Sequence, residues 1–135
     1  MDEPRRLCLI TGASAGIGAA FARVYASHGY DLALTARRAD RLQALAEDIR
    51  LRHGVETLVI PADLADREAP GRILAEIEAQ GRVVEALVNN AGYGLRGSYA
   101  TSDWAGLATQ LQVMLTAVCE LTHKTLPGMA ERRFG

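Results

Sequence analysis

The segment Thr11-Gly12-Ala13-Ser14-Ala15-Gly16-Ile17-Gly18 decides the fold of this chain. Its glycines follow the spacing G-x-x-x-G-x-G, between the apolar run 7–10 and an amphipathic pattern. Gly12 permits a tight turn, Gly16 lets the backbone approach a pyrophosphate, and Gly18 lets a helix pack closely on a sheet. The first N–H groups of that helix are free to bind phosphate. A glycine cluster in this context predicts a phosphate-binding turn between a strand and a helix, although a tight turn without ligand is the alternative.

Outside this turn, short apolar runs alternate with helix patterns. The runs 7–10, 32–36, 55–60 and 83–88 are typical of strands buried on both faces of a sheet. Such alternation implies parallel strands joined by right-handed helical crossovers. We therefore expect an α/β fold with a Rossmann-type, doubly wound parallel sheet and helices on both faces. The sheet is incomplete, because about four of the six strands of that fold lie in this chain.

The helix patterns have recognisable inward faces and ends. The expected inward residues are Ile17, Ala20, Phe21, Val24 and Tyr25, then Leu42, Leu45, Ala46 and Ile49, then Ile73, Leu74 and Ile77. The expected caps and stops are Gly29, Asp40, Gly54, Asp66, Gly81, and Ser102 or Asp103.

A last, long helix pattern has a continuous apolar stripe. Its members are Trp104, Leu107, Leu111, Met114, Leu115, Val118, Leu121, Thr122 and Thr125. Pro127-Gly128 is expected to end or kink this helix, and the residues 129–135 have no clear assignment. Leaving half the stripe in water loses several kcal/mol of apolar burial, on the order of a domain's net stability. We therefore expect further residues or a partner surface to cover it.

Composition limits the class of protein. With 135 residues, 49% of them hydrophobic, the chain is expected to form one folded domain over 1–135. Its 15 basic and 16 acidic residues leave a net charge of −1, which argues against a nucleic-acid partner. No apolar run approaches the roughly 18 residues of a membrane span. With no secretory signal in the sequence, we expect no membrane association and a cytoplasmic location.

The cysteines and histidines do not predict a metal site. Cys8 and Cys119 lie far apart, without a C-x-x-C pairing, and none of the three histidines has ligand spacing to either. We interpret both cysteines as buried free thiols in a reducing compartment.

Three motifs together resemble the short-chain dehydrogenase/reductase family. They are TGASAGIG at 11–18, Asp63-Leu64 after the third strand, and Asn89-Asn90-Ala91-Gly92 after the fourth. They occur in the family's order, and the likeness runs through all 135 residues. The resemblance implies a nicotinamide cofactor at the carboxyl ends of the strands. It assigns the phosphate loop to Gly12, Ser14, Gly16, Ile17 and Gly18, the adenine contact to Asp63 with Leu64 beside it, and the wall beside the ribose to Asn90, Ala91 and Gly92.

The residues themselves agree with these roles. An ionised carboxylate such as Asp63 can accept a hydrogen bond from an exocyclic amine. The small residues Ala91 and Gly92 leave room for a flat ring. Taken singly, a helix-capping Asp63 and a simple turn at 89–92 are alternatives. The glycine turn makes the binding interpretation the stronger one for both.

The end of the second strand predicts which cofactor binds. NAD-preferring sites place an acid there to bind the ribose 2′-hydroxyl. Here the sequence reads Thr35-Ala36-Arg37-Arg38, with no acid. Charge-assisted hydrogen bonds from guanidinium to a 2′-phosphate contribute roughly 1.5–3 kcal/mol each. We therefore expect NADP(H), with Arg37 as the main contact and Arg38 assisting. The alternative is a solvated helix start formed by these arginines and Arg41, although cations are unfavourable at a helix N-terminus.

No catalytic residue can be assigned in this chain. The resemblance implies a Tyr-x-x-x-Lys pair, a Ser after a fifth strand and an Asn in the fourth long helix, but no tyrosine here has a lysine four residues later. Met114 stands at the family's Asn position, with Gln112 the nearest polar residue. That departure puts efficient turnover in doubt and leaves cofactor binding untouched. By its chemistry, Met114 is a core-packing residue.

The expected function follows from the resemblance. The chain would be the amino-terminal, cofactor-binding part of an oxidoreductase that transfers a hydride between NADP(H) and a small carbonyl or secondary alcohol. The alternative is a non-catalytic dinucleotide-binding or regulatory protein. A different Rossmann enzyme, such as a methyltransferase, disagrees with Asn89-Asn90-Ala91-Gly92. The resemblance also implies a homo-oligomer, a dimer or tetramer formed through the long helices. The loops that set the substrate follow later strands, and only the segment 93–99 is expected near the mouth of the pocket.

Overall fold

A four-stranded parallel sheet forms the centre of the molecule in the computed structural model, which describes residues 3–135. The strand order is β3-β2-β1-β4. The elements in chain order are β1 (Leu7–Thr11), α1 (Gly16–Ser27), β2 (Asp31–Ala36), α2 (Ala39–His53), β3 (Thr57–Pro61), α3 (Ala69–Ala79), β4 (Ala86–Val88), α4 (Trp104–Leu111) and α5 (Ala117–Arg132). In the register of the central pair, Leu7 lies opposite Asp31 and Thr11 lies opposite Thr35.

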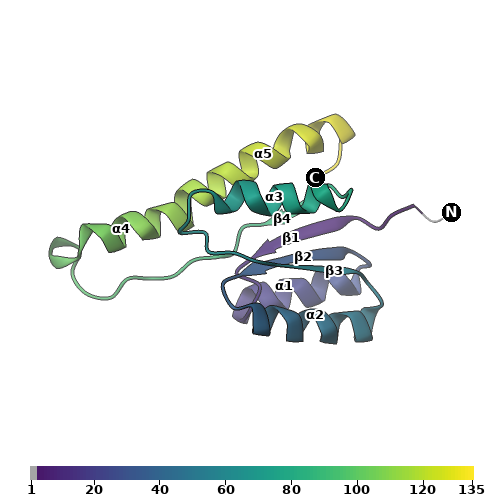
Figure 1. The fold of residues 1–135 in the computed structure, drawn as a ribbon, viewed down its shortest axis with the longest axis horizontal. Coiled ribbons are helices and arrows are strands. Elements are labelled where there is room, and N and C mark those ends of the chain that lie inside the picture. Colours follow the sequence, from purple (N-terminus) through teal and green to yellow (C-terminus); the bar gives the residue numbers. More distant parts are fainter. Residues whose placement is uncertain (1–2) are drawn as a thin grey trace.

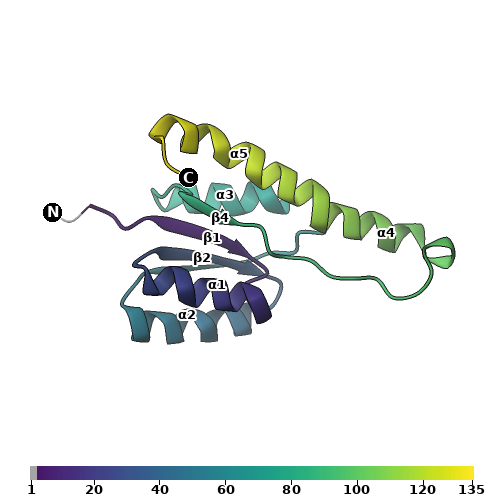
Figure 2. The same cartoon turned by 180° about the vertical axis from the view of Figure 1, so that it is seen from behind.

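Helices cover both faces of this sheet. Helices α1 and α2 lie on one face, and α3 and α5 lie on the other (Figures 1 and 2). Alternate residues of β1 face opposite layers, as the pleat of a strand requires. Cys8 and Ile10 pack into the core with α1 and α2, whereas Leu7 and Leu9 pack into the core with α3 and α5. The expected doubly wound α/β architecture is confirmed.

The inward face expected for α1 is wrong except at Tyr25, which is partly buried against the core. Ile17 is 70% exposed and Val24 is 54% exposed, and Phe21 is also exposed. The buried side is made of small residues: Gly18, Ala19, Ala22 and Ala26. A Cβ on Gly18 would collide with the carbonyl oxygen of Gly12, so only a helix with small residues on this side can come this close to the sheet. The close approach of α1 to the sheet therefore decides which face of the helix is buried, although the residues on that face are less hydrophobic than those in solvent.

Helix α2 agrees with its expected interior and end, but its start differs. Leu42, Leu45, Ala46 and Ile49 are buried, and the helix ends at Gly54, whose φ of 64° is left-handed. Asp40 is not the cap: it lies in the first turn, and Arg38 occupies the N-cap position without a side-chain hydrogen bond. The expected start was therefore too late by a residue or two.

Asp66 does not cap α3 either. Helix α3 begins three residues later, at Ala69, with Ile73 and Ile77 buried. The Oδ1 atom of Asp66 accepts a hydrogen bond from the backbone N–H of Glu68 at 2.9 Å, and its Oδ2 atom pairs with Arg72 at 2.8 Å. These two contacts, the backbone hydrogen bond first, lower the pKa of Asp66. The aspartate therefore stabilises the turn before the helix.

All four strands have other bounds than expected; β1 and β2 are each one residue longer, whereas β3 and β4 differ more. Strand β3 lies at an edge of the sheet and includes Pro61, which edge strands tolerate because their outer N–H groups need no partner. Strand β4 covers only 86–88. Glu85, just before it, contacts β1 through one backbone and one side-chain hydrogen bond. The Glu85 N–H donates to the carbonyl of Leu7 at 3.0 Å, while the Glu85 carboxylate accepts from the Leu7 N–H at 2.5 Å.

The long helix continues further than expected. A π-helical segment, Gln112–Thr116, joins α4 to α5 without a break. Pro127 lies inside α5, which runs on to Arg132, so the expected end at Pro127-Gly128 is wrong. Proline removes the hydrogen bond to the carbonyl four residues earlier, that of His123. His123 is exposed, so water can bind to that carbonyl.

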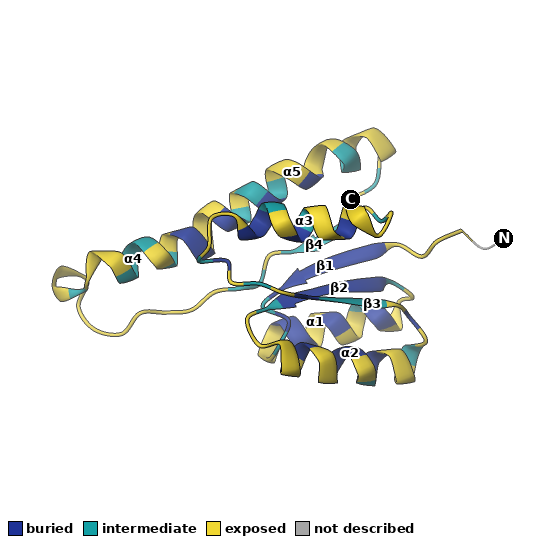
Figure 3. Cartoon of the chain, viewed as in Figure 1, coloured by how far each residue is buried: buried dark blue, intermediate teal, exposed yellow. Residues whose placement is uncertain are grey.

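Much of the apolar stripe on this long helix lies in solvent. Trp104 is 66% exposed and Leu115 is 55% exposed, whereas Leu121 and Thr125 are buried against the sheet layer (Figure 3). Helix α4 has no buried residue among those described, since it extends past the end of the sheet. Within residues 3–135, none of the helices combines the length and apolarity needed to cross a membrane.

The two cysteines differ in environment. Both are free; Cys8 is buried in β1, whereas Cys119 is exposed on α5. The expectation that both are buried is therefore wrong for Cys119. Burial raises the pKa of the Cys8 thiol to about 12.

At the amino ends of the strands, a buried carboxylate joins three segments. The Asp31 side chain is 5% exposed, and its Oδ2 atom pairs with Arg82 at 3.0 Å. Its Oδ1 atom accepts from the Glu56 N–H at 2.8 Å. Arg82 also donates to the carbonyl of Arg5 at 2.6 Å. These contacts join the segments before β1, β3 and β4 to the first residue of β2.

Candidate functional site

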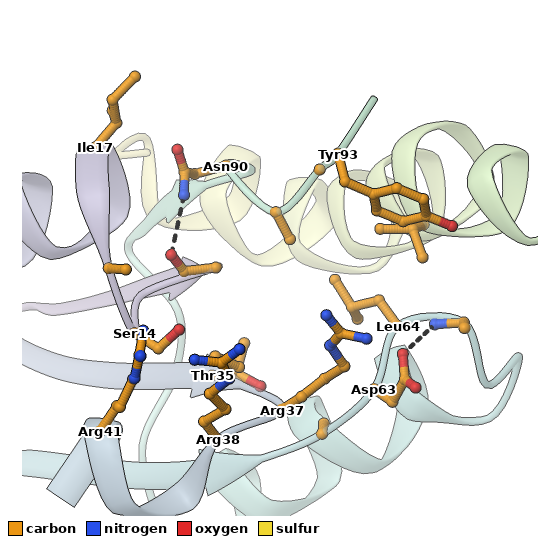
Figure 4. Close-up of a pocket in the computed structure, with 18 of the residues that line it drawn as sticks. Ser14, Ile17, Thr35, Arg37, Arg38, Arg41, Asp63, Leu64, Asn90 and Tyr93 are labelled. Carbon is orange, nitrogen blue, oxygen red and sulfur yellow. Dashed lines mark hydrogen bonds between the residues drawn. The ribbon is translucent and has the colours of Figure 1, made fainter. Parts of the chain in front are cut away.

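A cleft of about 620 Å³ opens at the carboxyl ends of the strands (Figure 4). Its walls come from the β1–α1 turn, the end of β2, the start of α2, the turn after β3, the loop after β4 and α4. All the predicted cofactor-binding residues except two line it: Gly12, Ser14, Ile17, Arg37, Arg38, Asp63, Leu64, Asn90, Ala91 and Gly92. Segments far apart in the sequence thus meet at one place.

The two exceptions, Gly16 and Gly18, lie close by. Gly16 has a φ of 56°, which favours glycine, and it lines an adjoining cavity of about 430 Å³. Gly18 lies beneath the turn, where a Cβ would fall 2.6 Å from the Asn90 side-chain nitrogen. Gly16 thus shapes the backbone of the turn, and Gly18 shapes the helix–sheet contact under it.

Thr11, which sequence reasoning did not select, joins the glycine turn to the loop after β4. Its Oγ1 atom accepts hydrogen bonds from the backbone N–H groups of Asn90 and Ala91, each at 2.9 Å. In return, the Asn90 side-chain amide donates to the carbonyls of Thr11 and Gly12, each at 3.1 Å. The threonine directly before the first glycine was the available signal. These bonds hold two walls of the cleft at a defined separation.

Three arginines line one side of the cleft without an anionic partner. Arg37, Arg38 and Arg41 are exposed, and no side chain among residues 3–135 forms an ion pair or hydrogen bond with their guanidinium groups. Asp63 is the one acidic residue lining the cleft in this part of the chain, and its Oδ1 atom accepts from the Ala65 N–H at 3.0 Å. The side of the cleft at the end of β2 is therefore strongly positive.

A buried hydroxyl in the same region has no partner. Thr35 is 1% exposed and lines the cleft, and its Oγ1 atom has no hydrogen-bond partner in the described structure. Its backbone carbonyl accepts from the Ala13 N–H at 3.2 Å, which ties β2 to the glycine turn. An unpaired buried hydroxyl is unfavourable unless another polar group arrives. Sequence reasoning took Thr35 only as a strand residue.

The opposite end of the cleft is formed by the loop after β4 and by α4. Tyr93, Thr109 and Val113 line this end. The Gln110 side chain donates to the Tyr93 carbonyl at 2.9 Å, which connects the loop to α4. Sequence reasoning expected the segment 93–99 near this mouth, but it did not identify the contribution of α4.

Met114 lies beside the cleft and not in the core. It is 46% exposed, and a Cβ on Gly92 would fall 3.1 Å from its Cε atom, so its side chain covers Gly92. The interpretation of Met114 as a residue that only packs in the core is therefore wrong. It lies within the π-helical segment, a rare form that occurs frequently at functional sites. No group of three or more His, Cys, Asp or Glu side chains in residues 3–135 is arranged to hold a metal ion.

The chain matches a family of known sequence and fold. A family model described as short chain dehydrogenase matches residues 6–135. Sulfoacetaldehyde reductase 2 of Chromohalobacter salexigens is 38% identical over 130 residues, 96% of this chain and 51% of that protein. The NADP-dependent 3-hydroxy acid dehydrogenase YdfG of Salmonella typhi is 35% identical over 133 residues, 96% of this chain and 51% of that protein.

Solved structures give the same result. A short-chain dehydrogenase from Sphingobium yanoikuyae in complex with NADPH has a TM-score of 0.89 and 32% identity. L-Sorbose reductase from Gluconobacter frateurii, complexed with NADPH and L-sorbose, has a TM-score of 0.89 and 29% identity. Each match covers 96% of this chain, with 50% of the first structure's chain and 49% of the second's. The chain thus spans about half the length of the relatives that it matches.

Proposed function

Since the chain belongs to the short-chain dehydrogenase family, we propose that residues 1–135 form the NADP(H)-binding, amino-terminal part of an oxidoreductase domain. The whole protein would transfer a hydride between NADP(H) and a small carbonyl or secondary alcohol substrate. The bound nicotinamide supplies the hydride chemistry. The residues of this chain would bind and orient the cofactor.

The observation that carries the proposal is the set of unpaired arginines in the cleft. Three guanidinium groups without an ion-pair partner in the described residues suit a dianionic 2′-phosphate. The NAD-type alternative needs an acid at the end of β2, and the residues there are Arg37 and Arg38. NADP(H) is therefore the cofactor that this site favours, with Arg37 as the main contact and Arg38 assisting.

Other features of the cleft fit the same cofactor. Thr35, whose buried hydroxyl has no partner among the described residues, also lines the cleft. The Gly12 and Gly16 backbone, with φ values of 62° and 56°, leaves the start of α1 open to a pyrophosphate. Asp63, with Leu64 beside it, would bind the adenine, and Ala91 with Gly92 would leave space along the ribose; all four residues line the cleft. The size of the cleft, about 620 Å³, suits a ligand of this class.

The chain's surroundings are part of the proposal. We expect a cytoplasmic protein, because Cys119 is exposed and free. We also expect a homo-oligomer, as the resemblance implies. The apolar residues of α4 and of the π-helical segment lie in solvent, where a partner surface or further residues of the domain would cover them.

Two measurements test the proposed function. Calorimetric titration of the protein with NADPH and NADH should give tighter binding of NADPH. NADPH oxidation should then be followed with a panel of ketones and aldehydes. Tight NADPH binding without any rate above background would indicate a non-catalytic dinucleotide-binding protein. Failure to bind either nucleotide at millimolar concentration would contradict the proposed cofactor site.

A further inference from the structure

Among residues 3–135, Arg41 is the one cationic residue that borders both cavities at the glycine turn. It lines the main cleft together with Ser14 and Ala15, and all three also line the adjoining cavity. Figure 4 shows its side chain on the Ser14 side of the site, whereas that of Arg37 lies towards Asp63 and Leu64. Arg38 lies between them, near Thr35. The three arginines therefore approach the end of β2 from different sides.

The position of Arg41 is electrostatically unfavourable without an anion. It lies in the first turn of α2, where the helix dipole disfavours cations. Arg38 is three residues before it, and like charges at this spacing repel. Asp48, which lines the adjoining cavity together with Arg41, is already paired with Arg52 at 2.6 Å. Asp40 precedes Arg41 in the same turn, but no acid among residues 3–135 forms an ion pair with Arg41, so its guanidinium group is left for a ligand.

We infer that Arg41 is a third specificity residue of the site, which holds the 2′-phosphate from the side of Ser14 while Arg37 and Arg38 hold it from the end of β2. The inference rests on the proposed function and adds a contact by Arg41, which enters the sequence-based expectations only in the alternative of a solvated helix start. A pyrophosphate contact is the competing role. This role is less favoured because the free N–H groups at the start of α1 are available to bind the pyrophosphate. Arg41 instead lies on the helix that follows β2, and the end of β2 is where the ribose 2′-position binds.

The experiment compares Arg41→Ala with Arg52→Ala in the protein. Both variants remove one positive charge from α2, but Arg52 lines neither cavity. Calorimetry would measure binding of NADPH, NADH, adenosine 2′,5′-bisphosphate and adenosine 5′-diphosphate. We expect Arg41→Ala to weaken NADPH and the 2′,5′-bisphosphate at least fivefold, and NADH and the 5′-diphosphate less than twofold. Arg52→Ala should leave all four unchanged within twofold.

The outcomes separate this inference from the proposed function. If Arg41→Ala binds NADPH as the unmodified protein does, while the unmodified protein still prefers NADPH, Arg41 is not a contact and the cofactor site stands. Equal weakening of all four ligands would make Arg41 a pyrophosphate or folding residue and overturn the inference. Circular dichroism spectra of both variants would identify a folding defect. If the unmodified protein binds none of the ligands, the proposed cofactor site itself fails, and this inference with it.

Discussion

At the residue scale, the guanidinium group of Arg37 is the strongest determinant of cofactor choice that the sequence predicts. It extends into the cleft without a counter-ion from the described residues (Figure 4). A charge-assisted contact to a 2′-phosphate exists only for NADP(H), because NAD(H) has a hydroxyl there. The effect of removing the side chain should therefore depend on the phosphate.

We predict that Arg37→Ala weakens NADPH binding at least tenfold and NADH binding less than twofold. Tenfold corresponds to about 1.4 kcal/mol, just below the roughly 1.5–3 kcal/mol of one charge-assisted hydrogen bond, so one lost bond accounts for at least this effect. Calorimetric dissociation constants for both nucleotides check the prediction, with Arg52→Ala as the matched control. Equal losses for the two nucleotides would remove Arg37 from the 2′-phosphate site.

The buried Cys8 thiol predicts a dependence of stability on alkaline pH. Its pKa is about 12 in the folded chain, against an ordinary value near 9. Below pH 9 both states keep the proton, so the thiol contributes no pH dependence. Between about pH 9 and 12 the unfolded chain loses the proton first, and this favours unfolding by up to about 1.4 kcal/mol per pH unit.

Urea unfolding between pH 8 and pH 10.5 tests this effect. The free energy of unfolding should fall more steeply with pH in the unmodified protein than in Cys8→Ala. The comparison of slopes cancels titrating groups that the two proteins share and that Cys8 does not influence. Tyr25, whose pKa is raised mainly by burial and next by the charge of Cys8, contributes to the measured difference. Parallel pH profiles for the two proteins would show that the thiol keeps an ordinary pKa in the folded state.

At the element scale, the close approach of α1 to β1 depends on Gly18. A Cβ at this position meets the Gly12 carbonyl and the Asn90 side chain, and both belong to the cleft. We predict that Gly18→Ala lowers the free energy of unfolding by about 1–3 kcal/mol, the usual range for overpacking. It should also weaken NADPH and NADH equally, because the turn itself must move.

Gly106→Ala in α4 is the matched control. No atom lies within 4 Å of the added Cβ, and alanine favours a helix by about 0.8–1.0 kcal/mol over glycine. This variant should be as stable as the unmodified protein or more so, in the same urea titration. Gly18→Ala with unchanged stability would mean that α1 does not need its close contact.

The sequence predicts the elements of this fold better than the faces they bury. The glycine spacing and the apolar runs predict strands, helices and parallel order, because these patterns are local. Which face of α1 is buried depends on contacts with distant residues. The large side chains of Ile17 and Phe21 lie in solvent and the alanines are buried, because the backbone of Gly12 lies directly beneath the helix. Likewise, Pro127 predicts a helix end, but an exposed turn tolerates it.

The candidate site follows the same division. The motif residues of each strand end were recognisable from the sequence, and the parallel topology brings them to one edge. Thr11, Thr35 and Arg41 were not selected, because their importance comes from contacts across elements. Thr11 binds the loop after β4 through Asn90, which lies 79 positions later in the chain. A single sequence shows that Thr11 precedes the first glycine, but it does not show which distant loop Thr11 binds.

At the scale of the whole molecule, the uncovered apolar residues of the long helix predict association. Leu111 and Leu115 are 48% and 55% exposed, and they lie four residues apart on one side of the helix. Burying one such side chain contributes about 1.5–3 kcal/mol. We predict that Leu115→Arg raises the dissociation constant of the oligomer at least tenfold, measured by size-exclusion chromatography with light scattering.

Leu51→Arg is the control for this prediction. Leu51 is 83% exposed on α2, on the opposite face of the sheet from α5, so the same substitution there should leave the molar mass unchanged. An unmodified protein that is monomeric at all concentrations would contradict the proposed homo-oligomer.

The buried carboxylate of Asp31 has a consequence for how the molecule tolerates change. It joins the segments that lead into β1, β3 and β4 at the end of the sheet away from the cleft. The contacts of Asp31 hold the strands together at that end, so the residues around the ligand are not the only ones that fix the positions of the strands. Nucleotide preference can then drift, or be redesigned at positions 37, 38 and 41, while the scaffold stays folded.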